Sequence, residues 1–366
     1  MERTEEKLFA LIRQRLAEGA AVELPHEMLS DLYVLAQKHE LAHILADTPA
    51  LTGLILDQSP FQQRLLEAHY RSQRYQQAYV ELCRCFQEEK IPFIPLKGLV
   101  LRELYPENWM RTSCDMDIAL RPEDMKRAAG LLEGSLGYRP KAMSDHDLSF
   151  ISTDGVRVEL HHTLIENNPV LAAFWSHAEV EEGCRFRLEQ PYFYLYHIAH
   201  LAKHFRHGGC GIRPLLDLWL MERAGMEPPM QLLEQCGLAV FAVACRHLAG
   251  CWFDGNPMDE DLLQMQDFIL RGGIYGSDAN RQLLKKTSGV KSRHLSRIFV
   301  PLEELQYTYP VLRRHRWMLP VCQLRRWGSL LLGSKARRRR ESLRSAPDLN
   351  RQQIEAAAML LTRLGL

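Results

Sequence analysis

Two aspartates, Asp115 and Asp117, lie two positions apart in the alternating segment DMDIAL. In a β-strand, residues i and i+2 project from the same face, so both carboxylates share one face and the apolar side chains between them point to the other. Two neighbouring anions repel each other unless a cation lies between them. The pair is therefore a candidate metal site, although the same spacing also occurs in strands that bind no metal.

A third carboxylate, Glu159, lies in a second alternating segment, VRVELHH. Asp154 and Gly155 separate this segment from another alternating run, DLSFIST, and Asp-Gly between two such runs is the strongest short-range signal of a β-hairpin. If the Glu159 strand lies beside the DMDIAL strand, the three carboxylates share one surface. Three oxygen ligands fit Mg²⁺ far better than Zn²⁺.

An anion site is predicted upstream of these carboxylates. The strand-like run IPFIPL is followed by Lys97, Gly98 and a helical pattern. A glycine turn and the amides of a helix N-terminus can receive a phosphate, which a nearby lysine neutralises. Arg111, four residues before Asp115, would supply a second cation. An anion site beside a carboxylate cluster is what metal-assisted phosphoryl transfer requires.

The elements that must position these residues follow from the periodicity of the apolar positions. Helical spacing dominates the first part of the chain, short strands and helices then alternate, and helical spacing returns afterwards. The sequence thus predicts an N-terminal helical region (1–90), an α/β core (91–165), a second helical region that closes the cleft (166–305) and a basic, aromatic-rich C-terminal segment (306–366).

The net charge of +1 conceals a segregation of charge along the chain. The stretch from Arg313 to Arg344 holds eleven lysines and arginines against Glu341 alone, a net charge of +10, whereas residues 1–312 carry −9. Three interpretations of this basic end remain open: a helix docked on the acidic body, an arm that binds nucleic acid, or a helix that lies on an anionic membrane surface.

Histidines at helical spacing form a second candidate group. His197, His200 and His204 share one face of a helix predicted over residues 192–205. They are interpreted either as part of the cleft wall, with Asp217 of the next helix as a candidate partner, or as a solvated stripe. A zinc site is disfavoured because the glutamate of the HExxH motif is missing.

Cysteine usage and the chain start bear on the compartment. The nine cysteines form no CxxC pair, which argues against a disulfide framework and against a zinc ribbon. The first residues are charged and helical, and no stretch of about 18 apolar residues is present. The sequence therefore predicts a cytoplasmic protein.

The run PLKGLVLRELYPENWMRTSCDMDIAL and the later VRVELHH together resemble the nucleotidyltransferase superfamily typified by DNA polymerase beta. Within it, they are similar to a bacterial nucleotidyltransferase family that carries Leu-Lys-Gly, an arginine, Asp-x-Asp, and then an acidic residue before Leu-His. The resemblance implies an α+β fold in which a small mixed β-sheet is embedded between mainly helical regions. It also implies transfer of a nucleotidyl group from an NTP to a hydroxyl of an acceptor.

The resemblance further implies roles for individual residues. Two Mg²⁺ ions, or Mn²⁺ in their place, would be held by Asp115, Asp117 and Glu159. The phosphates would be contacted by Lys97, Gly98 and Arg111. His161 matches the histidine of the Leu-His pair; it either positions substrate, supports Glu159 or is satisfied by the backbone at the strand end.

One position departs from the superfamily pattern. The wider superfamily has Gly-Ser at the phosphate turn, whereas Leu99 follows Gly98 here, so a hydroxyl that contacts the triphosphate is missing. This departure motivates a first alternative, a catalytically silent nucleotide- or RNA-binding regulatory module on the same fold. A second alternative is a peripheral membrane or polyanion-binding protein that acts through its basic C-terminus.

Overall fold

The structure is a computed structural model, and its described part covers most of the chain. It describes residues 4–17, 19–54, 59–143, 147–166, 168–273, 309–313, 315–332 and 351–366, together with Gly276, Asn280, Arg281 and Leu284. Arg314 and residues 333–350, which include most of the basic run, lie outside the described residues.

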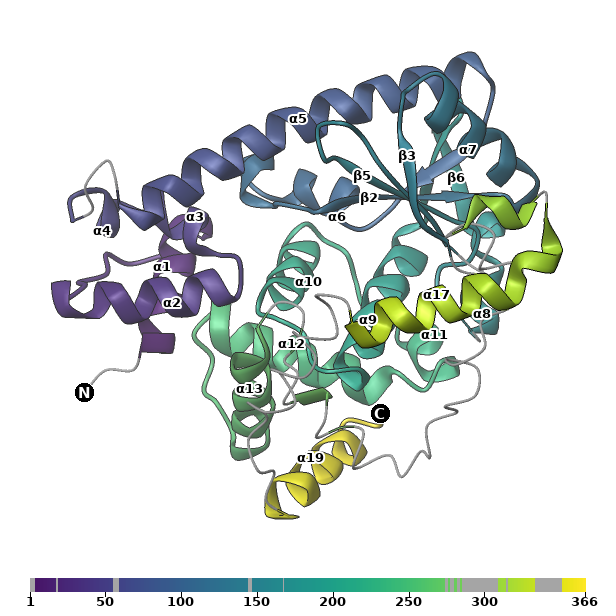
Figure 1. The fold of residues 1–366 in the computed structure, drawn as a ribbon. Helices are drawn as coiled ribbons and strands as arrows, with labels where there is room; N and C mark the ends of the chain where they lie inside the picture. The colour runs from purple at the N-terminus through teal and green to yellow at the C-terminus, as the bar shows by residue number, and fades with distance from the viewer. Residues whose placement is uncertain are drawn as a thin grey trace.

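The first described elements are helices. They are α1 (Thr4–Leu16), α2 (Leu29–Lys38), α3 (Ala42–Ala46), α4 (Pro49–Thr52) and the long α5 (Pro60–Glu88). Ser59 caps α5 by accepting a hydrogen bond from the amide of Gln62, and Pro60 occupies the first turn, where its missing N–H costs no hydrogen bond. Figure 1 shows α5 extending from the N-terminal helices along the sheet.

One mixed seven-stranded sheet forms the centre of the fold, with the order β3-β4-β5-β2-β1-β7-β6. The strands are β1 (Phe93–Pro95), β2 (Asp115–Leu120), β3 (Arg139–Met143), β4 (Asp147–Ile151), β5 (Arg157–His161), β6 (Ala178–Glu182) and β7 (Arg185–Leu188). β2 pairs antiparallel with β1 and parallel with β5. The predicted α+β fold with a mixed sheet is confirmed.

Strands β4 and β5 form the predicted hairpin. They pair antiparallel, and Gly155 in the connection has φ 84°, a left-handed conformation that glycine adopts without a steric penalty. The hairpin of β6 and β7 was not predicted. Because β7 also pairs with β1, the sheet includes strands that come later in the sequence than the β4–β5 hairpin.

The two faces of β2 and β5 have different environments. Met116, Ile118 and Leu120 are fully buried, as are Val158 and Leu160. They form one hydrophobic cluster with side chains of α5 and of α7 (Met125–Gly134). Since side chains alternate along a strand, the acidic residues between them face the opposite side of the sheet.

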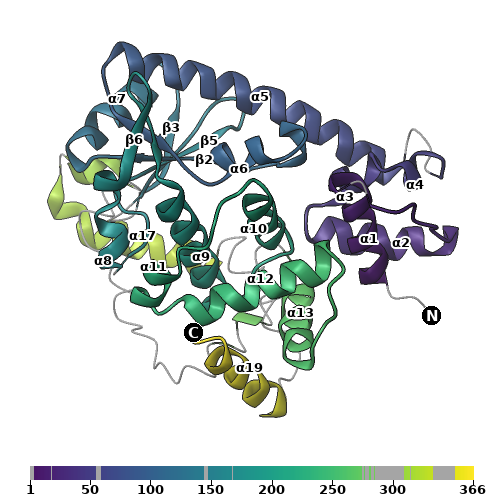
Figure 2. The same cartoon turned by 180° about the vertical axis from the view of Figure 1, so that it is seen from behind.

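Further helices lie between and after the strands. They are α6 (Gly98–Leu101), α8 (Pro169–Ala172), α9 (Gln190–Arg206), α10 (Arg213–Arg223), α11 (Met230–Gln235), α12 (Ala239–Phe253), α13 (Glu260–Gly272), α17 (Leu319–Leu332) and α19 (Arg351–Arg363). Figures 1 and 2 show α9 and α10 directly beneath the sheet.

The N-terminal helices belong to the same large hydrophobic core as α9, α10 and α12. The ring of Phe9 in α1 stacks on that of Trp252 in α12 with centroids 4.6 Å apart, and Arg13 donates a hydrogen bond to the Trp252 carbonyl at 2.7 Å. This packing fixes the helices that form the wall opposite the sheet. Among the described residues, no helix combines the length and apolar character needed to cross a membrane.

Candidate active site

The parallel pairing of β2 and β5 brings the predicted carboxylates together. Asp117 lies directly opposite Glu159 in the strand register. Asp115, Asp117 and Glu159 line one cavity of about 360 Å³ between the sheet and the helices. We call these three residues the acidic cluster. The hydroxyl of Tyr75 in α5 donates a hydrogen bond to the Asp115 carbonyl at 2.7 Å and so fixes the start of β2.

Asp117 is the most deeply buried member of the acidic cluster, with 3% of its surface exposed. Its Oδ1 accepts hydrogen bonds from Lys97 Nζ and from His161 Nε2, each at 2.7 Å. Burial alone would raise the pKa of Asp117, but Lys97 and His161 hold this pKa well below its usual value. The carboxylate is therefore ionised and paired.

His161 bridges two carboxylates. Its Nε2 donates to Asp117, its Nδ1 bonds to Asp147, and the nearest oxygen of Glu159 lies 4.0 Å away. Burial opposes a charge on the ring, but the hydrogen bonds to Asp117 and Asp147 raise the pKa of His161 to about 9. The ring is thus an imidazolium at neutral pH that makes its contacts with side chains of the site.

The negative charges of Asp115 and Glu159 are much less compensated by neighbouring cations than that of Asp117. Within the described part of the chain, the Asp115 side chain forms no hydrogen bond or ion pair, and Glu159 has only the 4.0 Å contact with His161. Burial raises the pKa of both carboxyls, and the charge of Asp117 raises it further. Among the described residues, Asp115 therefore has no protein cation in direct contact, and Glu159 has only the distant ion pair with His161.

This donor set fits a divalent cation. Ligand atoms of Asp117 and Glu159 lie within 4.8 Å of each other, and His161, which is an imidazolium, would hold Asp117 in place and would not itself bind the ion. Asp115, two positions before Asp117 on the same strand, adds a further carboxylate at the same cavity. Carboxylate oxygens are the preferred ligands of Mg²⁺, and the insufficiently compensated negative charge would be neutralised by such an ion.

The predicted phosphate turn lies at the same cavity, which both Lys97 and Gly98 line. Lys97 has φ 45° and ψ −118°, a conformation that non-glycine residues rarely adopt and that is often found at functional sites. Helix α6 has four residues, so its dipole can contribute little to anion binding. The positive charge at the turn comes from Lys97, and Tyr196 of α9 lines the same cavity.

Arg111 lines the cavity but is bound by a second buried aspartate. Its Nε and Nη2 donate to the two carboxylate oxygens of Asp217 at 2.7 and 2.9 Å, and the Tyr105 hydroxyl donates to Asp217 Oδ1 at 2.8 Å. Burial would raise the pKa of Asp217, but Arg111 lowers it. We call Asp217, Arg111 and Tyr105 the Asp217 cluster; Asp217 pairs with this arginine and not with the histidines.

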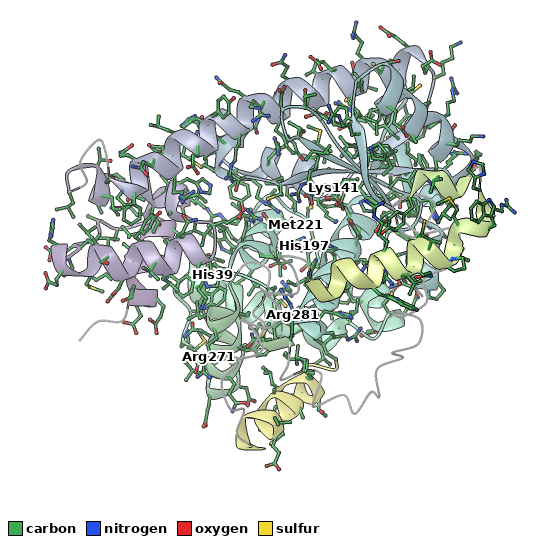
Figure 3. All side chains as sticks on the ribbon, viewed as in Figure 1. His39, Lys141, His197, Met221, Arg271 and Arg281 are labelled. Carbon is green, nitrogen blue, oxygen red and sulfur yellow. The ribbon has the colours of Figure 1, made fainter. Side chains whose placement is uncertain are left out.

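The histidines of α9 lie on the wall opposite the acidic cluster. His200 and His204 line the cavity, with their Nε2 atoms 3.2 Å apart. Burial lowers the pKa of His204 to about 4 and that of His200 well below its usual value, so both are neutral at neutral pH. His197, which Figure 3 labels near the middle of the molecule, donates from Nε2 to the Pro214 carbonyl at 2.9 Å.

Among the polar residues at or beside the cavity that were not singled out from the sequence are Tyr105, Ser113, Asp147 and Tyr196. Each lies in a loop, at a strand end or in an otherwise apolar helical pattern, and its partner is distant in the chain. Local spacing therefore carries no signal for them. A short sequence window cannot show which loop will lie on which strand.

A sheet whose neighbouring strands bring acidic side chains to a cavity beside a lysine-glycine turn defines a class of phosphoryl-transfer sites. A family model described as an uncharacterised nucleotidyltransferase matches residues 25–254, which include every residue that lines this cavity. The chain belongs to this nucleotidyltransferase family. No curated protein and no solved structure matches it.

Proposed function

We propose that this protein transfers a nucleotidyl group from an NTP to a hydroxyl of an acceptor, with Mg²⁺ as its cofactor and pyrophosphate as the leaving group. The observation that carries the proposal is the acidic cluster: three carboxylates on adjacent strands share a cavity with a lysine-glycine turn, and among the described residues two of them have at most one distant protein cation. The family match supports the same reaction type.

In this proposal the acidic cluster holds the metal, with Mn²⁺ as an alternative ion. The metal would supply a Lewis acid for the phosphate oxygens. Lys97 and Gly98 contact the phosphates, and Arg111, fixed by Asp217, orients the loop that leads into β2. His161 keeps Asp117 ionised and in place through its hydrogen bond.

The remaining cavity wall would receive the acceptor. His200 and His204 are neutral and lie at the cavity, so they can donate and accept hydrogen bonds from a hydroxyl-bearing acceptor. We also propose that the core belongs to the DNA polymerase beta-like superfamily and is of bacterial type. The order of Lys-Gly turn, arginine, Asp-x-Asp and Glu-Leu-His supports this assignment.

The test is Mg²⁺-dependent release of pyrophosphate from ATP, GTP, CTP and UTP, measured with cellular extracts as acceptor pools. We expect the wild type to release pyrophosphate from at least one NTP and Glu159→Gln to lose this activity. Asp154→Asn is the matched control, because Asp154 is exposed in the β4–β5 turn and Asn-Gly forms the same turn type. Binding of an NTP without pyrophosphate release from any pool would instead favour the catalytically silent module.

A second candidate function rests on one surface of the C-terminal segment. Trp317, Val321 and Leu324 are 74%, 53% and 61% exposed, and their spacing places them on one face in and before α17. Arg316 and Arg325 are exposed on either side of this apolar face. An apolar stripe flanked by arginines is typical of a helix that lies on an anionic membrane surface.

Flotation with vesicles tests this second candidate. We expect binding to phosphatidylglycerol vesicles, none to phosphatidylcholine vesicles, and loss of binding in Trp317→Ser/Leu324→Ser. Leu66→Ser is the control, because Leu66 in α5 is 66% exposed but lies outside the basic segment. Equal flotation of wild type and double variant, or preferential binding of single-stranded RNA, would contradict a membrane role.

A further inference from the structure

Ser113 lies in the loop before β2 and lines the cavity, and the sequence patterns did not single it out. We propose that its hydroxyl binds a phosphate oxygen of the nucleotide at the Lys97–Gly98 turn. The inference rests on the proposed function and assigns to that site one further binding residue. The hydroxyl that the turn itself lacks would thus come from a different loop.

The first observation is the contact between Ser113 and the turn. A Cβ built on Gly98 would lie 1.9 Å from Ser113 Oγ and 3.1 Å from Ser113 Cβ. The serine hydroxyl therefore occupies the space that any side chain at residue 98 would need. A side chain at residue 98 would therefore have to displace the Ser113 hydroxyl, which favours glycine at this position.

The second observation is that the turn cannot provide a hydroxyl of its own. Leu99, the residue after Gly98, is 4% exposed and packs in the hydrophobic cluster on the far side of the sheet, together with Phe93 and Met116. It points into the protein interior. Within the part of the chain that the structure describes, the polar side chains near the Lys97–Gly98 turn that line the cavity are then those of Lys97 and of the loop that contains Ser113.

The third observation is that the loop is held on both sides of Ser113. Arg213 donates from Nη1 to the Thr112 carbonyl at 3.0 Å, and Arg111 donates from Nη1 to the same carbonyl at 2.8 Å. On the other side, Tyr75 binds the Asp115 carbonyl. The backbone that carries Ser113 is therefore held in place, which reduces the entropy lost when a ligand binds.

The fourth observation concerns the hydrogen bonds of the hydroxyl itself. Ser113 Oγ accepts one long contact of 3.5 Å from Arg111 Nη1, and its proton has no acceptor among the residues the structure describes. Ser113 lines the cavity beside Lys97. A fixed donor next to a lysine and an arginine N–H is suited to a phosphate oxygen, because hydrogen bonds to charged acceptors are the strong ones.

The experiment measures the dissociation constants of the NTP that the protein binds, and of the corresponding NMP, by calorimetry with Mg²⁺. We expect Ser113→Ala to weaken NTP binding about ten- to a hundredfold, the range for one hydrogen bond to a charged group. NMP binding should change much less, because the β- and γ-phosphates are absent. Ser113→Thr, which keeps the hydroxyl, should bind the NTP nearly as the wild type does.

A swap of the hydroxyl between the two segments controls for indirect effects. Gly98→Ser/Ser113→Gly moves the hydroxyl from the loop to the turn and removes the collision at residue 98, so it should recover NTP affinity. Gly98→Ala/Ser113→Gly removes the same collision without a hydroxyl and should stay weak. Thermal unfolding of each variant reports whether it is folded.

The outcomes separate this inference from the proposed function. If the wild type binds no NTP with Mg²⁺, the proposed function fails and the role of Ser113 fails with it. If the wild type binds an NTP and Ser113→Ala binds it equally well, the inference about Ser113 is overturned while the proposed function stands. An equal loss of NTP and NMP affinity in Ser113→Ala would also overturn it.

Discussion

Two buried aspartates on opposite walls of the cavity, Asp117 and Asp217, have the same burial but different surroundings. They are 3% and 1% exposed, and both pair with a cation. Asp217 is saturated by a bidentate arginine and by a tyrosine hydroxyl. Asp117 shares its two cations with neighbouring carboxylates, Asp115 and Glu159, which have no comparable partners.

The difference shows how a structural ion pair is distinguished from a reactive site. Perturbed pKa values occur at both, so the shift alone does not separate them. The charge balance does: the Asp217 cluster pairs one anion with one cation, whereas the acidic cluster keeps an excess of negative charge beside an open cavity. An excess of buried charge is costly unless a ligand compensates it.

The largest expected effect is on catalysis, from Asp117→Asn. Loss of one metal ligand should lower kcat/KM for pyrophosphate release about a thousandfold, since metal stabilisation of the transition state amounts to several kcal/mol. The melting temperature should change little, because the lost ion pairs with Lys97 and His161 are offset by relief of repulsion from Asp115 and Glu159. Retention of a tenth of the activity would contradict the assignment.

The corresponding change in the Asp217 cluster should act on stability. Asp217→Ala leaves the Arg111 charge buried without its partner, so the free energy of unfolding should fall by about 3–5 kcal/mol in urea denaturation. The double variant Arg111→Met/Asp217→Leu removes both charges and should recover most of this loss. A single variant within about 1 kcal/mol of the wild type would show that the pair is not structural.

Acid should destabilise the protein through His43, which lies next to the Asp217 cluster. The Nε2 of His43 donates to the carbonyl of Met110, next to Arg111, and burial lowers the pKa of His43 from 6.5 to about 4. As the pH falls, the unfolded state therefore binds a proton at His43 before the folded state does. The free energy of unfolding decreases between about pH 6.5 and about pH 4, by up to roughly 3 kcal/mol.

Urea denaturation at pH 7 and pH 5 checks this dependence. His43→Gln keeps the N–H donor but does not titrate, so its stability should fall less than that of the wild type between the two values. His247→Gln is the matched control, because His247 is exposed on α12. If His43→Gln and the wild type lose the same stability, the acid sensitivity does not arise from His43.

The smallest effect is expected from Tyr105→Phe. This variant removes one of the three hydrogen bonds to Asp217 and leaves the bidentate arginine in place. A hydrogen bond to a charged group contributes about 1.5–3 kcal/mol, and the unfolding free energy should fall by an amount near the lower end of that range. A loss as large as that of Asp217→Ala would show that the tyrosine, not the arginine, dominates the cluster.

The part of the site that depends on strand periodicity could be predicted from the sequence. Alternation placed Asp115 and Asp117 on one face, and the Asp-Gly signal placed Glu159 on a hairpin strand; its position beside the Asp115 strand was only a condition of the prediction. The register that sets Asp117 opposite Glu159 confirms that the two segments are neighbours. These features depend on residues that are close together in the sequence, so they can be predicted from a single sequence.

Features that depend on long-range packing could not be predicted. Arg111 and Asp217 are 106 positions apart, and the contact of Ser113 with Gly98 joins a loop to a turn across a strand. The β6–β7 hairpin was missed because β6 is exposed along most of its length and rich in glutamate, which has a low strand propensity. Its pairing with the sheet through β7 comes from tertiary contacts.

Binding of Mn²⁺, followed by the loss of its free-ion electron paramagnetic resonance signal, tests the central claim most directly. The account predicts that the wild type and Asp154→Asn bind the ion equally, and that Asp117→Asn and Glu159→Gln bind it at least about tenfold more weakly, each protein being folded by thermal unfolding. Equal Mn²⁺ binding by all four proteins would contradict a metal site at the acidic cluster.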